Sequence, residues 1–412
     1  MLHLRINVRR IATLLLAVAA GCAKDPDYST HDAGTGDTGA VMSACPADAS
    51  ADAPAIDVGG GAPDAGGLNC AASCEFAGGV AVGCATRFQY GINFAWDQFA
   101  GDFGGISHWC APGVSRNARV RGELLDMRAN GVDTIRWWVF PDFRGDGVAL
   151  DGEGTPTGLG GTALADVNAA LALAAEAGVH VQFCLFSFDN FKPDRTLNNG
   201  RFIRGIRSII LDETKRAALM QAVVRPFARA VTTSPNAARA VAWDVINEPE
   251  WAISGTDAYG DMPFTPQTTV ETVSHTEMET FVRDVITAIR AESSLPITVG
   301  SAAAKWPKAW SGVDVDFYSI HIYDWINMQW PYSASASELG LMGKPVVVGE
   351  FPVNGLTGVP YSQMVESWYG NGYAGALGWA VNGGGSNAAL SWSMGKAGVK
   401  AFADAKGCST AY

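Results

Sequence analysis

The sequence predicts a (β/α)8 barrel, the α/β fold also called a TIM barrel, in which eight parallel strands alternate with helices. Two observations favour it: apolar runs of strand length alternate strictly with longer helical patterns, and almost every residue within these runs is apolar. Strands of that composition are buried on both faces, as in a parallel sheet covered by its crossover helices. Eight such units in roughly 320 residues match the size of one barrel.

The expected strands are short segments rich in aromatic and β-branched residues, the types that pack well on a pleated surface. They cover residues 88–96, 133–140, 179–188, 240–247, 296–301, 316–323, 345–351 and 375–381.

Helices are expected between these strands, where the pattern becomes amphipathic or rich in alanine. They cover residues 116–130, 162–177, 212–232, a segment from Ser274 onward, a short Trp-bearing segment after residue 301, and 396–406. Gly131 and Gly178 are expected to end the first two helices. Ser274 and Glu277 have the spacing of a capping box, and Pro226 should kink the third helix.

A doubly wound open sheet is the alternative fold. It would need a glycine-rich turn that binds phosphate directly after an early strand. The only glycine-rich candidate, residues 145–161, lies in a long loop and lacks the GxGxxG pattern. The barrel therefore remains the prediction.

Residues 1–21 have the features of an export signal. Arg5, Arg9 and Arg10 precede an apolar run, 11–20, that is too short to span a bilayer as a helix. The run ends in VAAGC and resembles a bacterial lipoprotein signal, in which Cys22 would be lipidated. We expect an outer-membrane or cell-surface lipoprotein, or, if cleavage occurs nearby without lipidation, a secreted protein.

Residues 22–67 are mostly Asp, Ala, Gly, Thr, Ser and Pro, a composition too poor in apolar side chains to fold, so we expect a flexible linker. Residues 68–412 are expected to form the barrel, with an N-terminal extension stapled to it by disulfides. Six cysteines could pair in ways that the sequence leaves open: Cys45, Cys70, Cys74, Cys84, Cys110 and Cys408. Cys184, inside the apolar run QFCLF, is expected to be a buried free thiol. Zinc is a weaker reading, since no CxxC pair occurs.

The charge balance excludes some partners. The net charge is −12 and no long basic run occurs, which argues against nucleic acid and anionic membrane surfaces. The 13 Trp and 10 Tyr residues exceed what a core of this size needs, and exposed aromatic rings stack on sugar faces. We expect a neutral polysaccharide as the partner and a monomeric chain.

Two carboxylates follow strand ends that should face the same side of the barrel. Glu248 comes after the fourth strand and Glu350 ends the seventh, and active residues of such barrels lie at the C-terminal ends of strands. A carboxylic acid and a nucleophilic carboxylate are what cleavage of a glycosidic bond needs. Arg136, flanked by apolar residues, needs a charged partner, and Glu350 is a candidate. His321 and Tyr323 alternate and so point to the same side of their strand.

The motifs WDVINEPEW, HxY, GEF and the Trp of the eighth strand resemble clan A retaining glycoside hydrolases, with family 5, the cellulase and mannanase group, nearest. The resemblance covers Gln89 to Asn382. It implies that Glu248 is the acid/base and Glu350 the nucleophile. It also implies no cofactor and no metal.

Further roles follow from the resemblance. Asn247 would bind the sugar 2-hydroxyl, and His321 would line the site near the cleaved bond. Arg136 and Tyr323 would orient Glu350 and hold its pKa down, and Trp379 would lie beneath the reacting sugar. Glu248 must begin protonated, so its surroundings should raise its pKa.

Seven more residues lie near or just beyond predicted strand ends and are candidate substrate contacts: Trp96, Asp97, Trp138, Asp189, Asn190, Trp251 and Trp325. The sequence departs from many family 5 cellulases after the third strand, where FSFDNF contains no His. This departure weakens a cellulase assignment and leaves the carboxylate pair intact.

The prediction is a retaining, endo-acting β-glycoside hydrolase that cleaves a β-mannan or β-glucan by double displacement. A non-catalytic carbohydrate-binding protein on the same scaffold is one alternative. A transglycosylase with the same residues is another.

Overall fold

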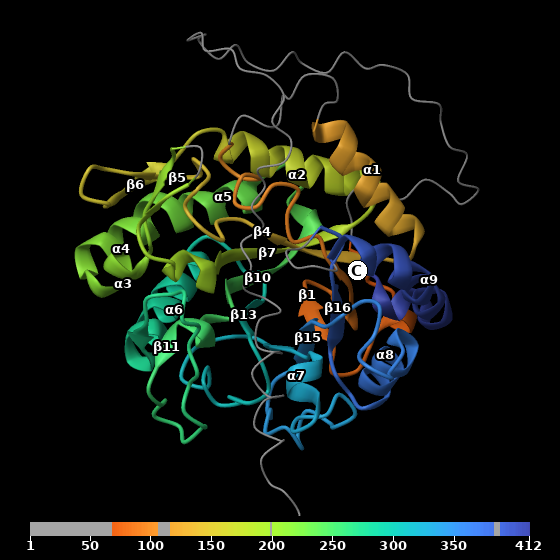
Figure 1. Cartoon of the computed structure of the whole chain (residues 1–412). Helices are drawn as coiled ribbons and strands as arrows, with labels where there is room; N and C mark the ends of the chain where they lie inside the picture. Colours follow the sequence, from red (N-terminus) through yellow and green to blue (C-terminus); the bar gives the residue numbers. More distant parts are fainter. Residues whose placement is uncertain (1–67, 106–115, 198–199, 383–387) are drawn as a thin grey trace, which may run out of the picture.

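The computed structural model describes residues 68–105, 116–197, 200–382 and 388–412, and it confirms the predicted barrel. Eight parallel strands close in the order β10-β13-β14-β15-β16-β3-β4-β7, so that neighbours in the sheet are successive strands of the chain (Figure 1). The predicted signal (1–21) and linker (22–67), with Cys22, Cys45 and Cys110, lie outside the described residues.

Each barrel strand falls within its predicted segment. The bounds are β3 (Gln89–Asn93), β4 (Thr134–Trp138), β7 (His180–Ser187), β10 (Ala240–Asn247), β13 (Ile297–Ser301), β14 (Tyr318–His321), β15 (Val346–Glu350) and β16 (Gly375–Trp379). Nearly every residue of these strands is buried, because side chains fill the barrel on one face and meet helices on the other.

Helices surround the barrel (Figure 1). They are α1 (Arg116–Ala129), α2 (Ala163–Ala177), α3 (Arg207–Leu211), α4 (Glu213–Leu219), α5 (Arg225–Thr233), α6 (His275–Arg290), α7 (Asp324–Asn327), α8 (Tyr361–Gly370) and α9 (Ala388–Lys406). The C-cap of α2 is Gly178, which is left-handed with φ 76°, and the predicted capping box at Ser274 is present.

Short antiparallel pairs occupy the loops. Strands β5 (Val148–Leu150) and β6 (Pro156–Leu159) form a hairpin in the glycine-rich loop, and β8 (Arg195–Thr196) pairs with β9 (Phe202–Ile203). The pair β11 (Ile253–Ser254) and β12 (Val273–Ser274) is parallel.

Three predicted helices are wrong in detail. The third is divided: α4 passes through a π-helical turn, Met220–Val224, into α5. Pro226 lies in the first turn of α5, where its missing N–H costs little. The segment after β13 forms a run of turns instead of a helix. There the indole N–H groups of Trp306 and Trp310 bond to groups elsewhere in the chain. The last helix begins at residue 388, earlier than the predicted 396.

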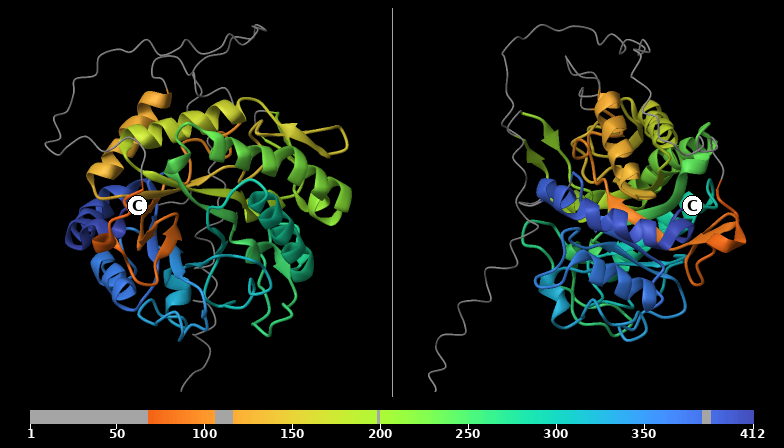
Figure 2. Two further views of the ribbon diagram at one scale, coloured as in Figure 1. Left: turned by 180° about the vertical axis from the view of Figure 1, so that it is seen from behind. Right: turned by 90° about the vertical axis from the view of Figure 1, so that its right-hand side faces the viewer.

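The hairpin of β1 (Val80–Val82) and β2 (Ala85–Arg87) covers the N-terminal end of the barrel. Its apolar side chains pack with residues at the starts of β10, β15 and β16 and with Tyr412. Figure 2 shows this hairpin, in orange, at one end of the molecule. The opposite end of the barrel, where the strands end, holds the candidate active site.

Two disulfides staple the extension, as predicted. Cys70 pairs with Cys84, and Cys74 pairs with Cys408 across 334 residues of chain. Cys184 is free and buried, which confirms that prediction. Disulfides persist in oxidising compartments, so these two disulfides indicate an exported protein. Among them, no helix is both long and apolar enough to cross a membrane.

Candidate active site

Two carboxylates meet at the C-terminal end of the barrel. Glu350 is the last residue of β15, and Glu248 directly follows β10. Both side chains are buried, and one oxygen of each lies within 4.8 Å of the other and of a ring nitrogen of His321. Retaining glycosidases hold their two carboxyl groups roughly 5–5.5 Å apart, whereas inverting enzymes leave room for a water, at about 6.5–9.5 Å. The close approach of the two carboxyl groups fits the retaining arrangement better than the inverting one.

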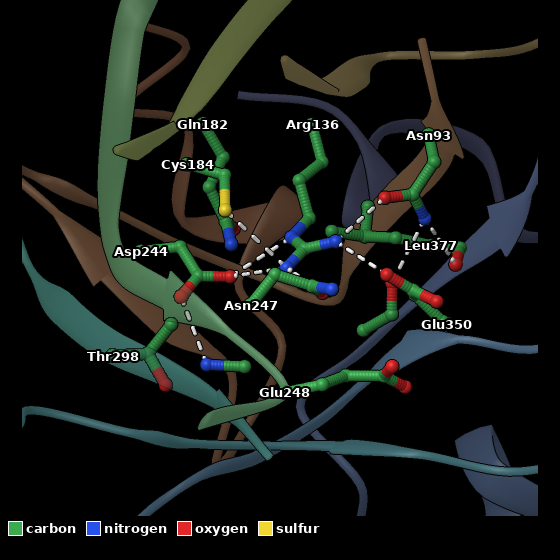
Figure 3. Close-up of polar contacts among 12 residues, drawn as sticks. Asn93, Arg136, Gln182, Cys184, Asp244, Asn247, Glu248, Thr298, Glu350 and Leu377 are labelled. Atoms are coloured by element: carbon green, nitrogen blue, oxygen red, sulfur yellow. Dashed lines mark hydrogen bonds and ion pairs between the residues drawn. The ribbon is translucent and has the colours of Figure 1, made fainter. Parts of the chain in front are cut away.

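The guanidinium of Arg136 lies at the centre of the site (Figure 3). Its Nη1 donates to Glu350 Oε1 at 2.7 Å, and its Nε donates to Asp244 Oδ2 at 2.8 Å. Further hydrogen bonds reach Asn93 Oδ1 at 3.0 Å and Asn247 Oδ1 at 2.9 Å. A fully buried guanidinium is tolerated only when charges and acceptors surround it in this way.

Asp244 and Gly300 complete the inner part of this network. Asp244 Oδ1 accepts a hydrogen bond from the backbone N–H of Gly300 at 2.8 Å. A Cβ on Gly300 would come within 2.7 Å of Arg136 Nη2 and 2.8 Å of Asp244 Oδ2, so only glycine fits beside the ion pair. The positive charge of Arg136 is therefore compensated on two sides, by Asp244 inside the barrel and by Glu350 at its C-terminal end.

The pKa of Glu350 differs from the prediction. Burial raises its pKa above the ordinary value, and the nearby Glu248 adds to this effect, while His321, Arg136 and the Tyr323 hydroxyl oppose it. Arg136 and Tyr323 do lower the pKa as expected, with Tyr323 Oη donating to Glu350 Oε2 at 2.9 Å. The prediction of a net decrease in this pKa is wrong because the loss of solvation raises the pKa more than these contacts lower it.

Glu248 has a different set of neighbours. Its Oε2 accepts from the indole N–H of Trp251 at 2.9 Å, and its Oε1 lies 2.8 Å from His321 Nδ1. Burial raises the pKa of Glu248 to about 7; Trp251 and Arg136 lower it somewhat, and Asp189 raises it further. The predicted direction is therefore correct, and desolvation is its main cause.

His321 contributes a neutral ring. Burial lowers its pKa to about 4, although the nearby Glu350 opposes the shift. The contact between His321 and Glu248 is consequently a hydrogen bond near neutral pH and not an ion pair. His321 Nε2 has no hydrogen-bond partner among the described residues.

Two groups of aromatic rings lie beside the carboxylates. Trp96, Trp138 and Trp379 come from the ends of β3, β4 and β16, with centroids 5.1–6.0 Å apart. Trp251 and Trp325 form the second group at 5.5 Å, and Trp325 is 41% exposed. The first group lies on the side of β16, next to the strand of Glu350, and the second contacts Glu248.

The other candidate contacts are engaged by the protein itself. Asp97 forms a two-pronged ion pair with Arg119, at 3.0 and 2.6 Å. Asp189 pairs with Lys192 at 3.1 Å. Asn190 bonds the backbone N–H of Ser187 in the capping box of the short 3-10 helix Phe188–Phe191. All three predicted substrate contacts thus have partners within the protein.

Sequence reasoning missed four residues of the site: Asn93, Cys184 and Asp244, which contact Arg136, and Glu250, which binds the segment after β13. A signal existed for Asp244, because a lone acid in the apolar run AVAWDVIN requires a buried partner. No comparable signal marks Asn93. Cys184 was predicted to be buried, and its Sγ lies 3.5 Å from Arg136 Nη2.

This geometry suits acid and nucleophile chemistry. One carboxylate contacts a guanidinium and a phenol, and the other contacts an indole and a neutral imidazole. Ligand atoms of Glu248, His321 and Glu350 are also close enough together to hold a metal ion, so metal chelation is a useful control in any assay.

The chain has sequence relatives, although no family model matches it. It is 25% identical over 331 residues to a mannan endo-1,4-β-mannosidase of Mytilus edulis, spanning 71% of this chain and 83% of that protein. A mannan endo-1,4-β-mannosidase of Cryptopygus antarcticus is 24% identical over 339 residues, spanning 72% and 81%.

A solved structure shows the same fold. The endo-1,4-β-mannanase from Eisenia fetida superposes with a TM-score of 0.65 and 23% identity, covering 79% of this chain and 94% of that one. This structural likeness confirms the fold. The two sequence relatives agree with the predicted resemblance to clan A retaining glycoside hydrolases, nearest family 5, and with the predicted class of O-glycosyl hydrolases.

The ion network predicts the effect of one substitution. Asp244→Ala leaves the buried Arg136 with one carboxylate partner and should lower the free energy of unfolding by about 3–5 kcal/mol. Urea unfolding followed by tryptophan fluorescence measures the loss. Asp404→Ala, which breaks an exposed pair with Lys400 on α9, is the control and should change stability little. Equal losses in the two variants would contradict the role given to Asp244.

Proposed function

We propose that this chain is a retaining endo-β-1,4-mannanase in which Glu248 is the acid/base and Glu350 the nucleophile. The observation that carries the proposal is the carboxylate pair. The two carboxyl groups approach as closely as a retaining mechanism needs. Glu350 contacts the guanidinium of Arg136, whereas burial is the main influence on the pKa of Glu248. The relatives act on mannan, and the polymer is therefore the first substrate to test.

The different neighbours assign the starting charges. Glu350 accepts from Arg136 and from the Tyr323 hydroxyl, and both contacts favour its ionised form. Glu248, with a pKa raised to about 7 by burial, keeps its proton in mildly acidic solution. The pair thus begins with one carboxylate and one carboxylic acid, the combination that a double displacement requires.

The reaction then takes two steps. In the first, a Glu350 oxygen attacks the anomeric carbon, the glycosidic bond breaks, and the departing oxygen takes the proton of Glu248. In the second, the Glu248 carboxylate takes a proton from water, whose oxygen attacks the anomeric carbon and releases Glu350. Two inversions retain the anomeric configuration.

The surrounding residues support binding of a sugar chain. Asn247, held by Arg136, is assigned to the 2-hydroxyl of the reacting sugar, and Trp379 to its apolar face. The Trp96 and Trp138 rings extend the aromatic surface on that side. Trp325 offers an exposed ring against Trp251, which binds Glu248. Asp97, Asp189 and Asn190 are assigned to shaping the rim.

Location and assembly belong to the same proposal. We assign residues 1–21 to an export signal, 22–67 to a linker and 68–412 to the catalytic barrel, which acts as a monomer. Lipidation of Cys22 would tether the enzyme to a membrane. A Cys22→Ala variant expressed in a bacterial host should then move from the membrane fraction to the soluble fraction.

The substrate is tested with a panel of polymers: β-mannan, mixed-linkage β-glucan, carboxymethyl cellulose, β-1,3-glucan and xylan. Wild type should release reducing ends from mannan, with an early fall in viscosity because internal bonds are cut. Glu350→Gln should lose at least about 10³-fold, since the nucleophile is gone. Glu366→Gln, on outer helix α8, is the matched carboxylate control and should keep full activity, as should wild type in EDTA. Full activity in Glu350→Gln would rule out the mechanism, and preference for a glucan would change the substrate.

The pH dependence follows from Glu248. Its folded-state pKa of about 7 means that the protonated acid is lost as the pH rises through that value. The kcat/KM for mannan should therefore fall above pH 7, approaching tenfold per pH unit. On a substrate whose leaving group needs no proton, the alkaline limb should be absent, because that reaction does not depend on the proton of Glu248. A limb at the same pH on that substrate would assign it to another group.

A further inference from the structure

Another buried carboxylate lies two residues beyond Glu248. Glu250 is 0% exposed and accepts three hydrogen bonds, from Ser301 Oγ at 2.6 Å, Ala302 N at 2.9 Å and Trp310 Nε1 at 2.7 Å. Its oxygens are occupied by protein donors and closed to solvent. Glu250 therefore does not touch substrate, and its place in the site needs another explanation.

The backbone at Glu248 explains why an anchor is needed. Glu248 adopts the left-handed conformation, φ 49° and ψ 47°, which costs a residue with a Cβ on the order of 1 kcal/mol or more. It leads into a four-residue 3-10 helix, Pro249–Ala252, too short to be stable by itself. Something outside the turn must hold this conformation.

The holding contacts come from β13 and the turns after it. The N–H of Glu248 donates to the carbonyl of Gly300 at 2.6 Å, and Glu250 binds the next two residues of the same segment. The turn is thus attached to the end of β13 on both sides of Pro249. Trp310 Nε1 adds a third attachment, from a segment that follows β13 in the chain.

The attached turn fixes the acid from two directions. Trp251, the residue after Glu250, donates its backbone N–H to the Glu248 carbonyl at 3.1 Å and its indole N–H to Glu248 Oε2 at 2.9 Å. Movement of Glu250 would displace both the Glu248 backbone and the indole that orients its carboxyl group. A shift of about 1 Å in a catalytic group can cost 10²-fold in rate.

We propose that Glu250 is a positioning residue for Glu248, which it holds through Ser301, Ala302 and Trp310 at the angle required to protonate the leaving oxygen. This inference rests on the proposed function. A plain anchor would not require a charge, since well-packed apolar residues often replace buried ionic groups without loss of stability. An ionised carboxylate accepts all three donors at once, whereas the amide of glutamine would turn its N–H2 toward at least one of them.

The test separates a misplaced acid from general damage by changing the leaving group. Glu250→Gln is assayed for kcat/KM on mannan and on a 2,4-dinitrophenyl β-mannoside, whose departing phenolate needs no proton. Because kcat/KM reports the first irreversible step, only the mannan reaction depends on the proton of Glu248. We expect a loss of about 10–10²-fold on mannan and less than about twofold on the aryl mannoside.

The other outcomes would overturn the proposal. Equal losses on both substrates would indicate a structural role only, and full activity on both would show that Glu250 is dispensable. Inactive wild type on mannan would instead contradict the proposed function. Trp310→Phe removes one hydrogen-bond donor to Glu250 without changing the charge, so it replaces Glu250→Gln if that variant does not fold. It should also lose more kcat/KM on mannan than on the aryl mannoside, by a smaller factor.

A matched control uses the same kind of bond elsewhere. Trp392 Nε1 donates to Asp126 Oδ2 at 2.8 Å on outer helix α9. Trp392→Phe should leave the ratio of the two kcat/KM values unchanged. A changed ratio in this variant would show that the leaving-group readout is not specific to the Glu248 turn, which would remove the support for a positioning role.

Discussion

The site depends on one buried cation. The Arg136 guanidinium is held by Asp244 within the barrel and binds Glu350 at its mouth, and both contacts are shorter than 3 Å. Burial alone would lower the pKa of Arg136, but the surrounding negative charges raise it above the ordinary value, so that the charge is permanent. Everything else is arranged around this charge: Gly300 leaves room for it, Asn93 and Asn247 accept its remaining hydrogens, and Glu350 is stabilised as the ion beside it.

The two carboxylates diverge because the barrel gives them unlike surroundings at almost the same depth. Both lose solvation, which raises both pKa values. Glu350 recovers part of that loss from Arg136 and Tyr323. Glu248 faces an indole N–H and a neutral histidine and recovers less. The proposed roles of acid and nucleophile thus follow from which strand end each residue occupies, and the turn after β10, fixed to β13, keeps Glu248 beside Trp251 and His321.

Strand order and the two carboxylates were predictable from sequence because both depend on local pattern: apolar runs identify strands, and β10 matches its predicted bounds to the residue. Of the two charged partners of Arg136, Glu350 was predicted and Asp244 was not, because the contact with Asp244 crosses 108 residues and exists only once the barrel closes. The prediction that the pKa of Glu350 is lowered was wrong for a related reason. The direction of the shift depends on the burial of the carboxylate as well as on Arg136, and both must be known. The segment after β13 was mistaken for a helix because its tryptophans bond to Met262 and Glu250, which periodicity does not reveal.

The most direct test of the account is to trap the covalent intermediate. A fluorinated β-mannosyl fluoride, which forms the glycosyl-enzyme readily and releases it slowly, would be incubated with the protein and the digest examined by mass spectrometry. We expect one added sugar, on the peptide that contains Glu350, and no label on Glu248. Label on Glu248 or another residue, or turnover of the reagent with inversion and no label, would contradict the assignment of the two carboxylates.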